Sequence, residues 1–344
     1  MIFSVGAPPI EEFAFVMTSH YFRRLLLPLT AALAAAATAA GPVAAETPEQ
    51  VTLPFSSITN PQSVVTDGSG NTYLVNGTDR GNDRVLRLGA DGHQIALPFT
   101  WLGGPVEVTT DGSTTTTRGT SQLPGLEVDT AGNITAVVNC GTGSGCENPI
   151  GYKVVRLSPD GTQSTLPFTN IGGPVTQPLD VVVDGSGNTT ITIAGAQPRV
   201  DRLSADGVQT TLPFTGLQGP YGLAVDNVGN TTVVDTITNR VVRVSPDGVQ
   251  TTLPFAGLYR PTHVAVDDNG NTTVSDTGNN RVVRLDPDGV QTVLGFTGLD
   301  YPTGVAVDSA GNTTVADSRN NRVVRLTEKQ APVPTPSPWP NFGS

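Results

Sequence analysis

Residues 294–326 read LGFTGLDYPTGVAVDSAGNTTVADSRNNRVVRL, and near-copies of this stretch precede it in the chain. Its opening tripeptide recurs as Leu-Pro-Phe, and the copies that start at Leu212 and Leu253 each lie 41 residues before the next copy. Further copies start at Leu53, Leu97 and Leu166. A fixed period of about 40 residues indicates a repeat architecture, in which each unit is one supersecondary structure that packs against its neighbours.

Each unit divides into four short strand-forming runs separated by residues that favour turns. In the unit after Leu253 the runs are 262–267, 271–275, 281–285 and 290–296. Asn, Asp and Gly fill the breaks, and these residues adopt turn conformations with little strain. Four strands in about 40 residues are typical of a β-propeller blade, whose faces are buried only when blades stack around an axis. The sequence therefore predicts an all-β fold.

The two ends of the repeat region predict how the ring of blades closes. The last unit ends at Leu326 after its third strand, whereas residues 50–55 form a fourth strand with no unit before it. Pairing the two removes two exposed sheet edges. We therefore expect a six-bladed β-propeller over residues 51–327, closed by an N-terminal strand.

The start of the chain has the pattern of an export signal. Arg23-Arg24 precede an apolar run over 25–40, and residues 43–45 read Val-Ala-Ala, which fits a signal cleavage site. The run is too short and too rich in small residues to indicate a membrane span, and no later segment is apolar enough. We expect a signal peptide over 1–45, no span in the mature chain, and a secreted or cell-envelope location.

Three further expectations concern the flanking segments. Translation starts at Met1 or at Met17, and either the general or the twin-arginine export route fits the signal. Residues 46–50 are expected to be a linker. The stretch 328–344 alternates proline with other residues, and we expect a disordered tail there.

Charge and cysteine content narrow the classes of partner. The formal net charge is −11, with no cluster of basic residues beyond Arg23-Arg24, so nucleic acid and anionic membranes are excluded as expected partners. Cys140 and Cys146 flank a Gly-Thr-Gly-Ser-Gly loop, which predicts a disulfide in an exported chain; two free structural thiols are the alternative. Neither a metal nor a cofactor is expected, and the chain is expected to be a monomer.

The tripeptide Asn-Arg-Val lies where the second break meets the third strand in the best-matching units, at 239–241, 280–282 and 321–323. Here the chain resembles NHL-repeat propellers, and in particular the extracellular sensor domain of actinobacterial (mycobacterial) receptor serine/threonine kinases. The resemblance covers residues 51–327, strongly in the last three units and loosely before them. The kinase motifs are absent. What the resemblance implies is a ligand-sensing propeller without phosphoryl transfer.

Groups suited to catalysis are few. His93 lies in the third-to-fourth strand turn of the first blade, and His263 opens the first strand of the fifth. In a propeller these positions lie on opposite faces, so the two cannot share a metal or a proton. His263 remains as a lone group at the channel mouth, with a solvated or structural histidine as the expected interpretation. Asp226 and Asp267, repeated in each blade, are expected to hold turns rather than calcium.

The departures from the repeat predict the binding face. Between Leu97 and Leu166 the chain is 69 residues long, with extra stretches over 103–122 and 139–152 that emerge on one face. Loops on a rigid scaffold commonly carry function, and aromatic and arginine side chains are enriched in interface anchors. The candidate ligand-face residues are Trp101, Tyr221, Tyr259, Arg260, His263 and Tyr301.

These features favour an exported, non-catalytic binding or sensing propeller that recognises an extracellular protein, peptide or glycan. The alternative is a propeller lyase or lactone hydrolase that acts through a carboxylate-lined channel. The two differ at the channel mouth, where acids clustered with His263 and an ion favour the enzyme. A purely structural envelope protein is the third reading, and it would show no selective ligand.

Overall fold

The computed structural model describes residues 48–77, 84–99, 106–110, 113–117, 125–141, 151–173 and 175–328. The chain divides into two units, Met1–Ala44 and Ala45–Ser344, and all described residues belong to the second. No helix in the described part is both long and apolar enough to cross a membrane. The predicted signal peptide, the tail beyond residue 328, Trp101 and Cys146 lie outside the described residues.

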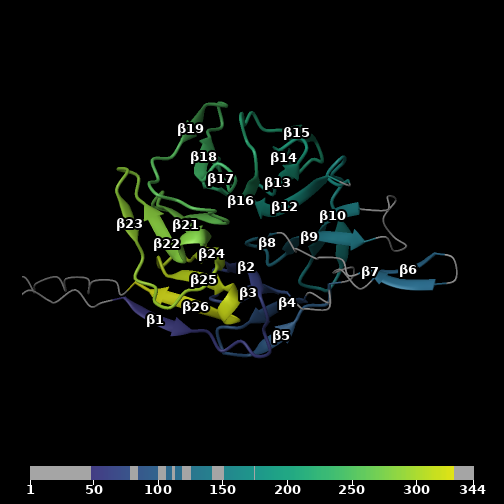
Figure 1. Cartoon of the computed structure of the whole chain (residues 1–344), viewed down its shortest axis with the longest axis horizontal. Helices are drawn as coiled ribbons and strands as arrows, with labels where there is room; N and C mark the ends of the chain where they lie inside the picture. The colour runs from purple at the N-terminus through teal and green to yellow at the C-terminus, as the bar shows by residue number, and fades with distance from the viewer. Residues whose placement is uncertain are drawn as a thin grey trace, which may run out of the picture. The chain divides into compact units, whose positions relative to one another are not determined.

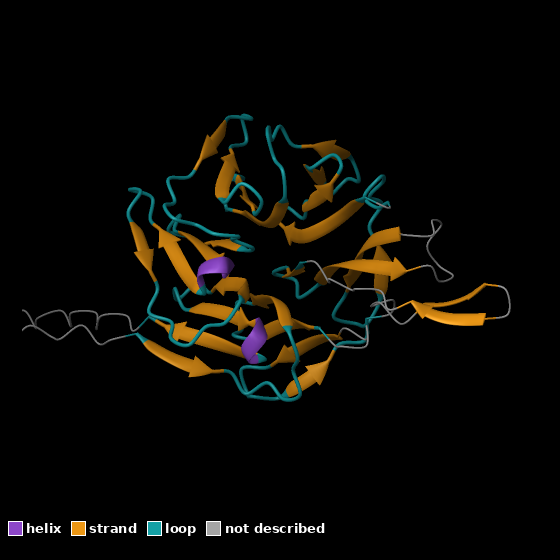
Figure 2. Ribbon diagram, in the orientation of Figure 1, coloured by secondary structure: helices purple, strands orange, loops and turns teal. Residues whose placement is uncertain are grey.

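Six four-stranded antiparallel sheets form the blades of a propeller (Figures 1 and 2). Blade 1 is β2 (Pro61–Thr66), β3 (Thr72–Asn76), β4 (Arg84–Leu88) and β5 (Gln94–Ala96). Blade 2 is β8 (Leu126–Val128), β9 (Ile134–Gly141), β10 (Gly151–Leu157) and β11 (Gln163–Thr165). Blade 3 is β12 (Thr176–Val183), β13 (Thr189–Gly195), β14 (Arg199–Leu203) and β15 (Gln209–Thr211).

The last three blades are the most regular. Blade 4 is β16 (Pro220–Val225), β17 (Thr231–Asp235), β18 (Arg240–Val244) and β19 (Gln250–Thr252). Blade 5 is β20 (Val264–Val266), β21 (Thr272–Asp276), the 3-10 helix η1 (Thr277–Asn279), β22 (Arg281–Leu285) and β23 (Gln291–Val293). Blade 6 has β24 (Pro302–Val307), β25 (Thr313–Asp317), η2 (Ser318–Asn320) and β26 (Arg322–Thr327). The four runs predicted for the unit after Leu253 are thus confirmed, with the first and last strands shorter than expected.

The N-terminal strand completes blade 6. β1 (Glu49–Thr52) pairs antiparallel with β26, and Gln50 lies opposite Leu326. This confirms the predicted closure, with β1 starting inside the segment 46–50 that was expected to be a linker. Because β1 and β26 pair with each other, neither strand leaves a free edge on the side where they meet.

The hydrophobic core lies between blades. Six clusters of buried side chains are each built from two neighbouring blades, and valine dominates them. The Leu-Pro-Phe motif feeds these clusters: the amide N–H of Phe255 donates to the carbonyl of Leu253 at 2.8 Å, closing a three-residue turn around proline. The fixed φ of proline suits the turn. Leu253 and Phe255 both pack against the cluster between blades 4 and 5.

The extra length between Leu97 and Leu166 takes two forms in the described residues. β6 (Val106–Thr110) and β7 (Ser113–Thr117) form a separate two-stranded hairpin. The second stretch prolongs a blade, because β9 and β10 are longer than their counterparts in blades 4 to 6 and pair up to Gly141 and Gly151. Cys140 lies in β9, whereas its predicted partner falls outside the described residues, so the disulfide stays a prediction.

Candidate functional site

A pocket of about 290 Å³ lies where the inner strands begin. Four blades contribute to it through the residues that flank a proline: Asn60 and Gln62 in blade 1, Tyr221 in blade 4, Arg260 and Thr262 in blade 5, and Tyr301 and Thr303 in blade 6, together with Thr236. We call it the mouth pocket. The same short X-Pro-Y segment, repeated around the ring, therefore presents different side chains to one cavity.

The segment that precedes Asn-Arg-Val in one blade fixes the X-Pro-Y segment of the next. The hydroxyls of Thr236, Thr277 and Ser318 donate to the carbonyls of the next prolines, Pro261, Pro302 and Pro61. The side-chain oxygens of Asn239, Asn280 and Asn321 accept the main-chain N–H of Arg260, Tyr301 and Asn60. The repeated segment around Asn-Arg-Val thus fixes the main chain of the residues that line the mouth pocket.

Buried ion pairs anchor the same segment within each blade. Asp276 is fully buried, and its Oδ2 lies 2.6 Å from Nε of Arg281. Its Oδ1 accepts the main-chain N–H of Tyr259 at 2.7 Å. Asp235 and Asp317 repeat this arrangement in blades 4 and 6. These aspartates are structural groups, because their oxygens are occupied by partners inside the blade.

The turn aspartates are occupied in the same way. Asp226 Oδ1 accepts the main-chain N–H of Val228 and of Asn230, and its Oδ2 accepts the Asn230 amide. Asp267 and Asp308 make the corresponding bonds. In the described part of the chain, no set of three His, Cys, Asp or Glu side chains is placed to hold a metal ion.

Three of the predicted ligand-face residues meet in the mouth pocket: Tyr221, Arg260 and Tyr301. No described carboxylate pairs with the exposed guanidinium of Arg260, whereas Arg319 packs its guanidinium 4.5 Å from the centre of the Tyr301 ring. Tyr259 is 54% exposed and does not line the pocket. The pocket thus combines one free positive charge with two phenol rings.

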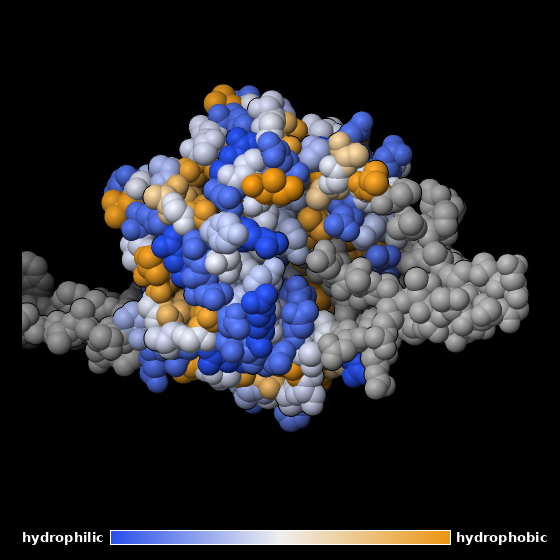
Figure 3. Space-filling model, viewed as in Figure 1, coloured by the Kyte–Doolittle hydropathy of each residue, from blue (hydrophilic) through white to orange (hydrophobic). Residues whose placement is uncertain are grey.

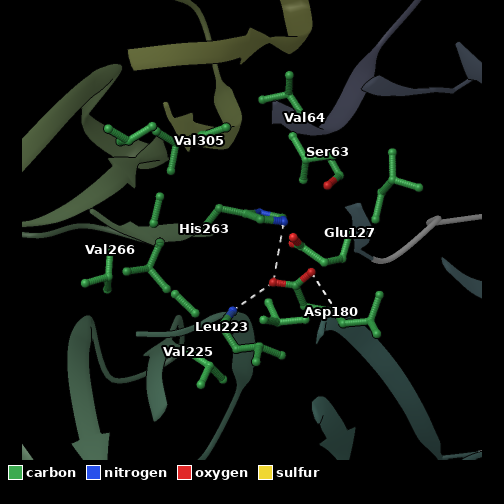
Figure 4. Close-up of a pocket in the computed structure, with 18 of the residues that line it drawn as sticks. Ser63, Val64, Glu127, Asp180, Leu223, Val225, His263, Val266 and Val305 are labelled. Carbon is green, nitrogen blue, oxygen red and sulfur yellow. Dashed lines mark hydrogen bonds and ion pairs between the residues drawn. The ribbon is translucent and has the colours of Figure 1, made fainter. Parts of the chain in front are cut away.

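A second cavity, of about 200 Å³, follows the inner strands from His263 toward their C-terminal ends and is lined by all six blades. We call it the channel cavity. Figure 4 shows the imidazole of His263 directed at the carboxyl groups of Asp180 and Glu127, with Ser63 beside them. Asp180 Oδ2 accepts the N–H of Leu223 in the next blade at 2.8 Å, and Oδ1 accepts the N–H of Val181.

The channel residues occupy one level of the ring. Counting back four residues from the turn aspartate in each blade gives Ser63, Gly125, Asp180, Gly222, His263 and Gly304. A Cβ atom on Gly125 would lie 1.6 Å from Asp180 Oδ1, and one on Gly222 would lie 2.5 Å from the Cα of His263. Glycine in one blade thus makes room for a larger side chain in the next.

Burial dominates the electrostatics of this cluster. It raises the pKa of Asp180 to about 7, against the lowering effect of the Leu223 and Val181 N–H donors. Burial, followed by the charge of Asp180, raises the pKa of Glu127 to about 8. Burial lowers the pKa of His263 to about 4, so its imidazole is neutral at pH 7.

His263 is the least satisfied polar group of the site. Its side chain is buried, and neither ring nitrogen has a hydrogen-bond partner within the described residues. Its Nε2 lies 3.9 Å from Asp180 Oδ2, which is too long for a hydrogen bond. The Tyr221 ring meets the imidazole edge-on, with centroids 5.8 Å apart, and so lies between the two cavities. The His263 side chain is therefore buried without a hydrogen bond to a described residue, whereas its main-chain N–H donates to Ser275 Oγ.

Sequence reasoning missed Asp180 and Glu127. Both lie in blades 2 and 3, where the repeat is loose. Aligning inner strands on the turn aspartate reveals them, because Glu127 stands where the other blades have Val65, Val182, Ala224, Ala265 and Ala306. A charged residue at an apolar repeat position was the available signal.

Comparison with known proteins supports the fold. Residues 299–326 match the NHL repeat. Virginiamycin B lyase from Staphylococcus aureus is 15% identical with a TM-score of 0.57, and the match covers 82% of this chain and 99% of that one. A gluconolactonase from Xanthomonas campestris is 17% identical with a TM-score of 0.60, over 81% and 89%. No curated protein sequence matches the chain.

A binding protein shares the architecture as well. In a nidogen/laminin complex the matched chain is 21% identical with a TM-score of 0.55, and the match covers 74% of this chain and 89% of that one. Likeness at such identity shows the fold and leaves the chemistry open. The chain is therefore a six-bladed β-propeller with an NHL repeat at residues 299–326.

Proposed function

We propose that the chain is an exported, non-catalytic binding or sensing propeller that recognises an extracellular or cell-envelope ligand at the mouth pocket. The observation that carries the proposal is the convergence of Tyr221, Arg260 and Tyr301 on one cavity. Phenol rings supply contact area with a polar end, and a free guanidinium binds carboxylates in a fixed geometry. The ligand is accordingly a polar glycan, peptide or protein segment with an acidic group.

The main chain of the mouth pocket is held rigidly, which favours ligand binding there. The main-chain N–H groups of Arg260 and Tyr301 donate to the side-chain oxygens of Asn239 and Asn280. Arg260 and Tyr301 have φ of 48° and 57°, a conformation that non-glycine residues seldom adopt. Because the preceding blade fixes the main chain at both residues, little backbone ordering is lost on binding. Hydrophilic side chains cover much of the described surface in Figure 3, with apolar ones in separate patches, which suits a polar ligand.

A sensing role is the finer part of the proposal. It rests on the resemblance to kinase sensor propellers, without the kinase. The nidogen chain in its laminin complex shows the same fold with a protein partner. We place the mature protein outside the cytoplasm, as a monomer that presents the mouth pocket to envelope or matrix components.

The test is a binding screen of the purified protein against envelope glycans, peptides and matrix proteins, followed by Arg260→Ala and Tyr301→Ala. Each substitution is expected to weaken binding by more than about 1 kcal/mol. Asp288→Ala, an exposed change in the turn between β22 and β23, is the matched control and should leave affinity unchanged. Equal affinity for all four proteins would overturn the proposal.

A propeller lyase or lactone hydrolase is the second candidate, and the channel cavity favours it. Glu127 and Asp180 with a neutral His263 supply a proton donor and an acceptor within one cavity, which general acid–base catalysis requires. A lactone or macrocyclic ester panel tests this. Turnover that is lost in Glu127→Gln and kept in Arg260→Ala would establish the enzyme and reject the mouth pocket as the principal site.

A further inference from the structure

The polar groups that face the channel cavity are acceptors or acids without a positive counterpart. They are Ser63, Thr66, Glu127, Asp180 and His263, and none of the described residues that line the cavity is a lysine or an arginine. Asp180 and His263 are 4% and 8% exposed. Buried carboxyl groups ordinarily pair with a cation or with several donors. Here main-chain N–H groups donate to Asp180 and Glu127, no described cation faces either acid, and the imidazole of His263 has no hydrogen-bond partner among the described residues.

The repeat does not require these groups. At the level of Asp180 and His263 the other four blades carry glycine or serine, and the position of Glu127 is valine or alanine in every other blade. Placing two acids side by side and leaving an imidazole without a partner costs stability, because each desolvated polar group lacks the bonds it had in water. A ligand that supplies the missing donors and charge would remove that cost.

The remainder of the channel cavity is apolar. Beyond the acid cluster the cavity is lined by valines and alanines of the inner strands, among them the partly buried Val65, Val182, Val225 and Val266. Figure 4 shows Val266 and Val305 on the side of His263 that faces away from Glu127. A matching ligand has a cationic head with several N–H donors at one end and a small apolar body at the other.

We propose that the channel cavity binds the protonated amino group of a small primary amine with an apolar substituent, held by Asp180, Glu127 and the acceptor nitrogen of His263. An ammonium group has three donors, and the cluster offers three acceptors on three blades, β8, β12 and the start of β20. Burial raises the pKa of both carboxyl groups, and a cation bound beside them would lower it again. This site is separate from the mouth pocket.

The alternatives have less support. A metal ion would need a set of three ligand side chains at bonding geometry, and the described residues provide none. An anion is excluded by the two acids. A neutral apolar molecule would fill the valine-lined end and leave the bare imidazole of His263 and the acid pair as they are.

The experiment compares benzylammonium chloride with benzyl alcohol, which has the same apolar body and no charge, by titration calorimetry on the full protein at pH 7.5. We expect saturable binding of the amine and at least about tenfold weaker binding of the alcohol, since hydrogen bonds to charged groups are the stronger kind. Glu127→Gln should weaken amine binding by about tenfold or more and leave alcohol binding unchanged. Asp288→Asn, an exposed carboxyl removed, is the control.

Three results would overturn the proposal. They are equal affinity for amine and alcohol, amine binding that survives Glu127→Gln unchanged, and tight Ca²⁺ or Mg²⁺ binding that competes with the amine. Glu127→Gln is nearly isosteric, and Glu127 makes no bond to a neighbouring blade among the described residues, so the variant is expected to fold. Ala265→Leu gives a second test: the larger side chain narrows the apolar part of the channel cavity and should block the binding of both amine and alcohol. The outcome is independent of Arg260→Ala, so the two sites are judged separately.

Discussion

Gln50 and Thr297, 247 positions apart in the sequence, are joined by two hydrogen bonds between the Gln50 side chain and the Thr297 main chain. The main-chain N–H of Thr297 donates to Gln50 Oε1 at 2.7 Å, and Gln50 Nε2 donates to the Thr297 carbonyl at 3.2 Å. Gln94, Gln209, Gln250 and Gln291 make the same clamp in four other outer strands, as between Gln250 and Thr215. In blade 6 alone the glutamine comes from the other end of the chain, so this clamp also fastens the ring.

Deleting residues 46–56 is expected to destabilise the protein strongly, because it removes β1 and leaves β26 with a free edge. Gln50→Ala should cost about 1–2 kcal/mol, the typical value of the two bonds lost. Urea unfolding measures both. Gln250→Ala is the matched control for the clamp, with a similar cost but no effect on closure. A deletion variant with the unfolding midpoint of the full chain would contradict the closure.

Glu127→Gln is expected to change how stability depends on pH. The carboxyl of Glu127 titrates near pH 8 when folded, against an ordinary value of 4.5. The folded state therefore holds a proton that the unfolded state releases, so stability falls as pH rises from about 4.5 to about 8. Glutamine cannot ionise. The melting temperature of the variant relative to the original should rise through this window and level off above it.

Thermal melts at pH 4.5, 6.5 and 8.5 measure this difference. His263 acts in the opposite direction between about pH 4 and 6.5, because its pKa is lowered on folding, but it is present in both proteins. The same substitution at the exposed Glu49 is the control. A difference that stays constant from pH 4.5 to 8.5 would show that Glu127 is not held protonated in the channel.

Asn280 is expected to matter for both stability and the mouth pocket. It has a φ of 53° and accepts the N–H of Tyr301 at 2.8 Å. Asn280→Ala loses the bond and strains the backbone, at a cost of about 2–3 kcal/mol, whereas Asn280→Gly loses only the bond and should cost about 1 kcal/mol. Urea midpoints separate the two. If alanine and glycine behave alike, the left-handed conformation is not what asparagine supplies.

A disulfide between Cys140 and Cys146 is expected in the exported protein. Mass spectrometry of the non-reduced chain after alkylation decides it, and two alkylated cysteines would contradict it. Since the loop is short, reduction should lower stability by about 2–3 kcal/mol at most.

The sequence predicted the repeat-built parts well because every blade repeats the same physical solution. Turn residues and the 41-residue period locate the strands, and an unpaired strand at each end requires closure. Tyr221, Arg260 and Tyr301 were predicted as aromatic and arginine side chains in the loops between blades. Asp180 and Glu127 were not, because a buried charge is informative only when its register in the inner strand is known. In blades 2 and 3 the repeat is loose, so the register of the inner strand is hard to read from the sequence.

The alternation of glycine with larger side chains around the channel has a consequence for how such a site changes over time. Gly304 abuts Ser63 as Gly125 abuts Asp180, so only the odd-numbered blades have room for a side chain at this level. The scaffold thus offers three positions, in blades 1, 3 and 5, where the side chain can vary, and two of them are occupied by Asp180 and His263. Ser63 is the third, and a single codon change there would give the channel new chemistry without disturbing a blade.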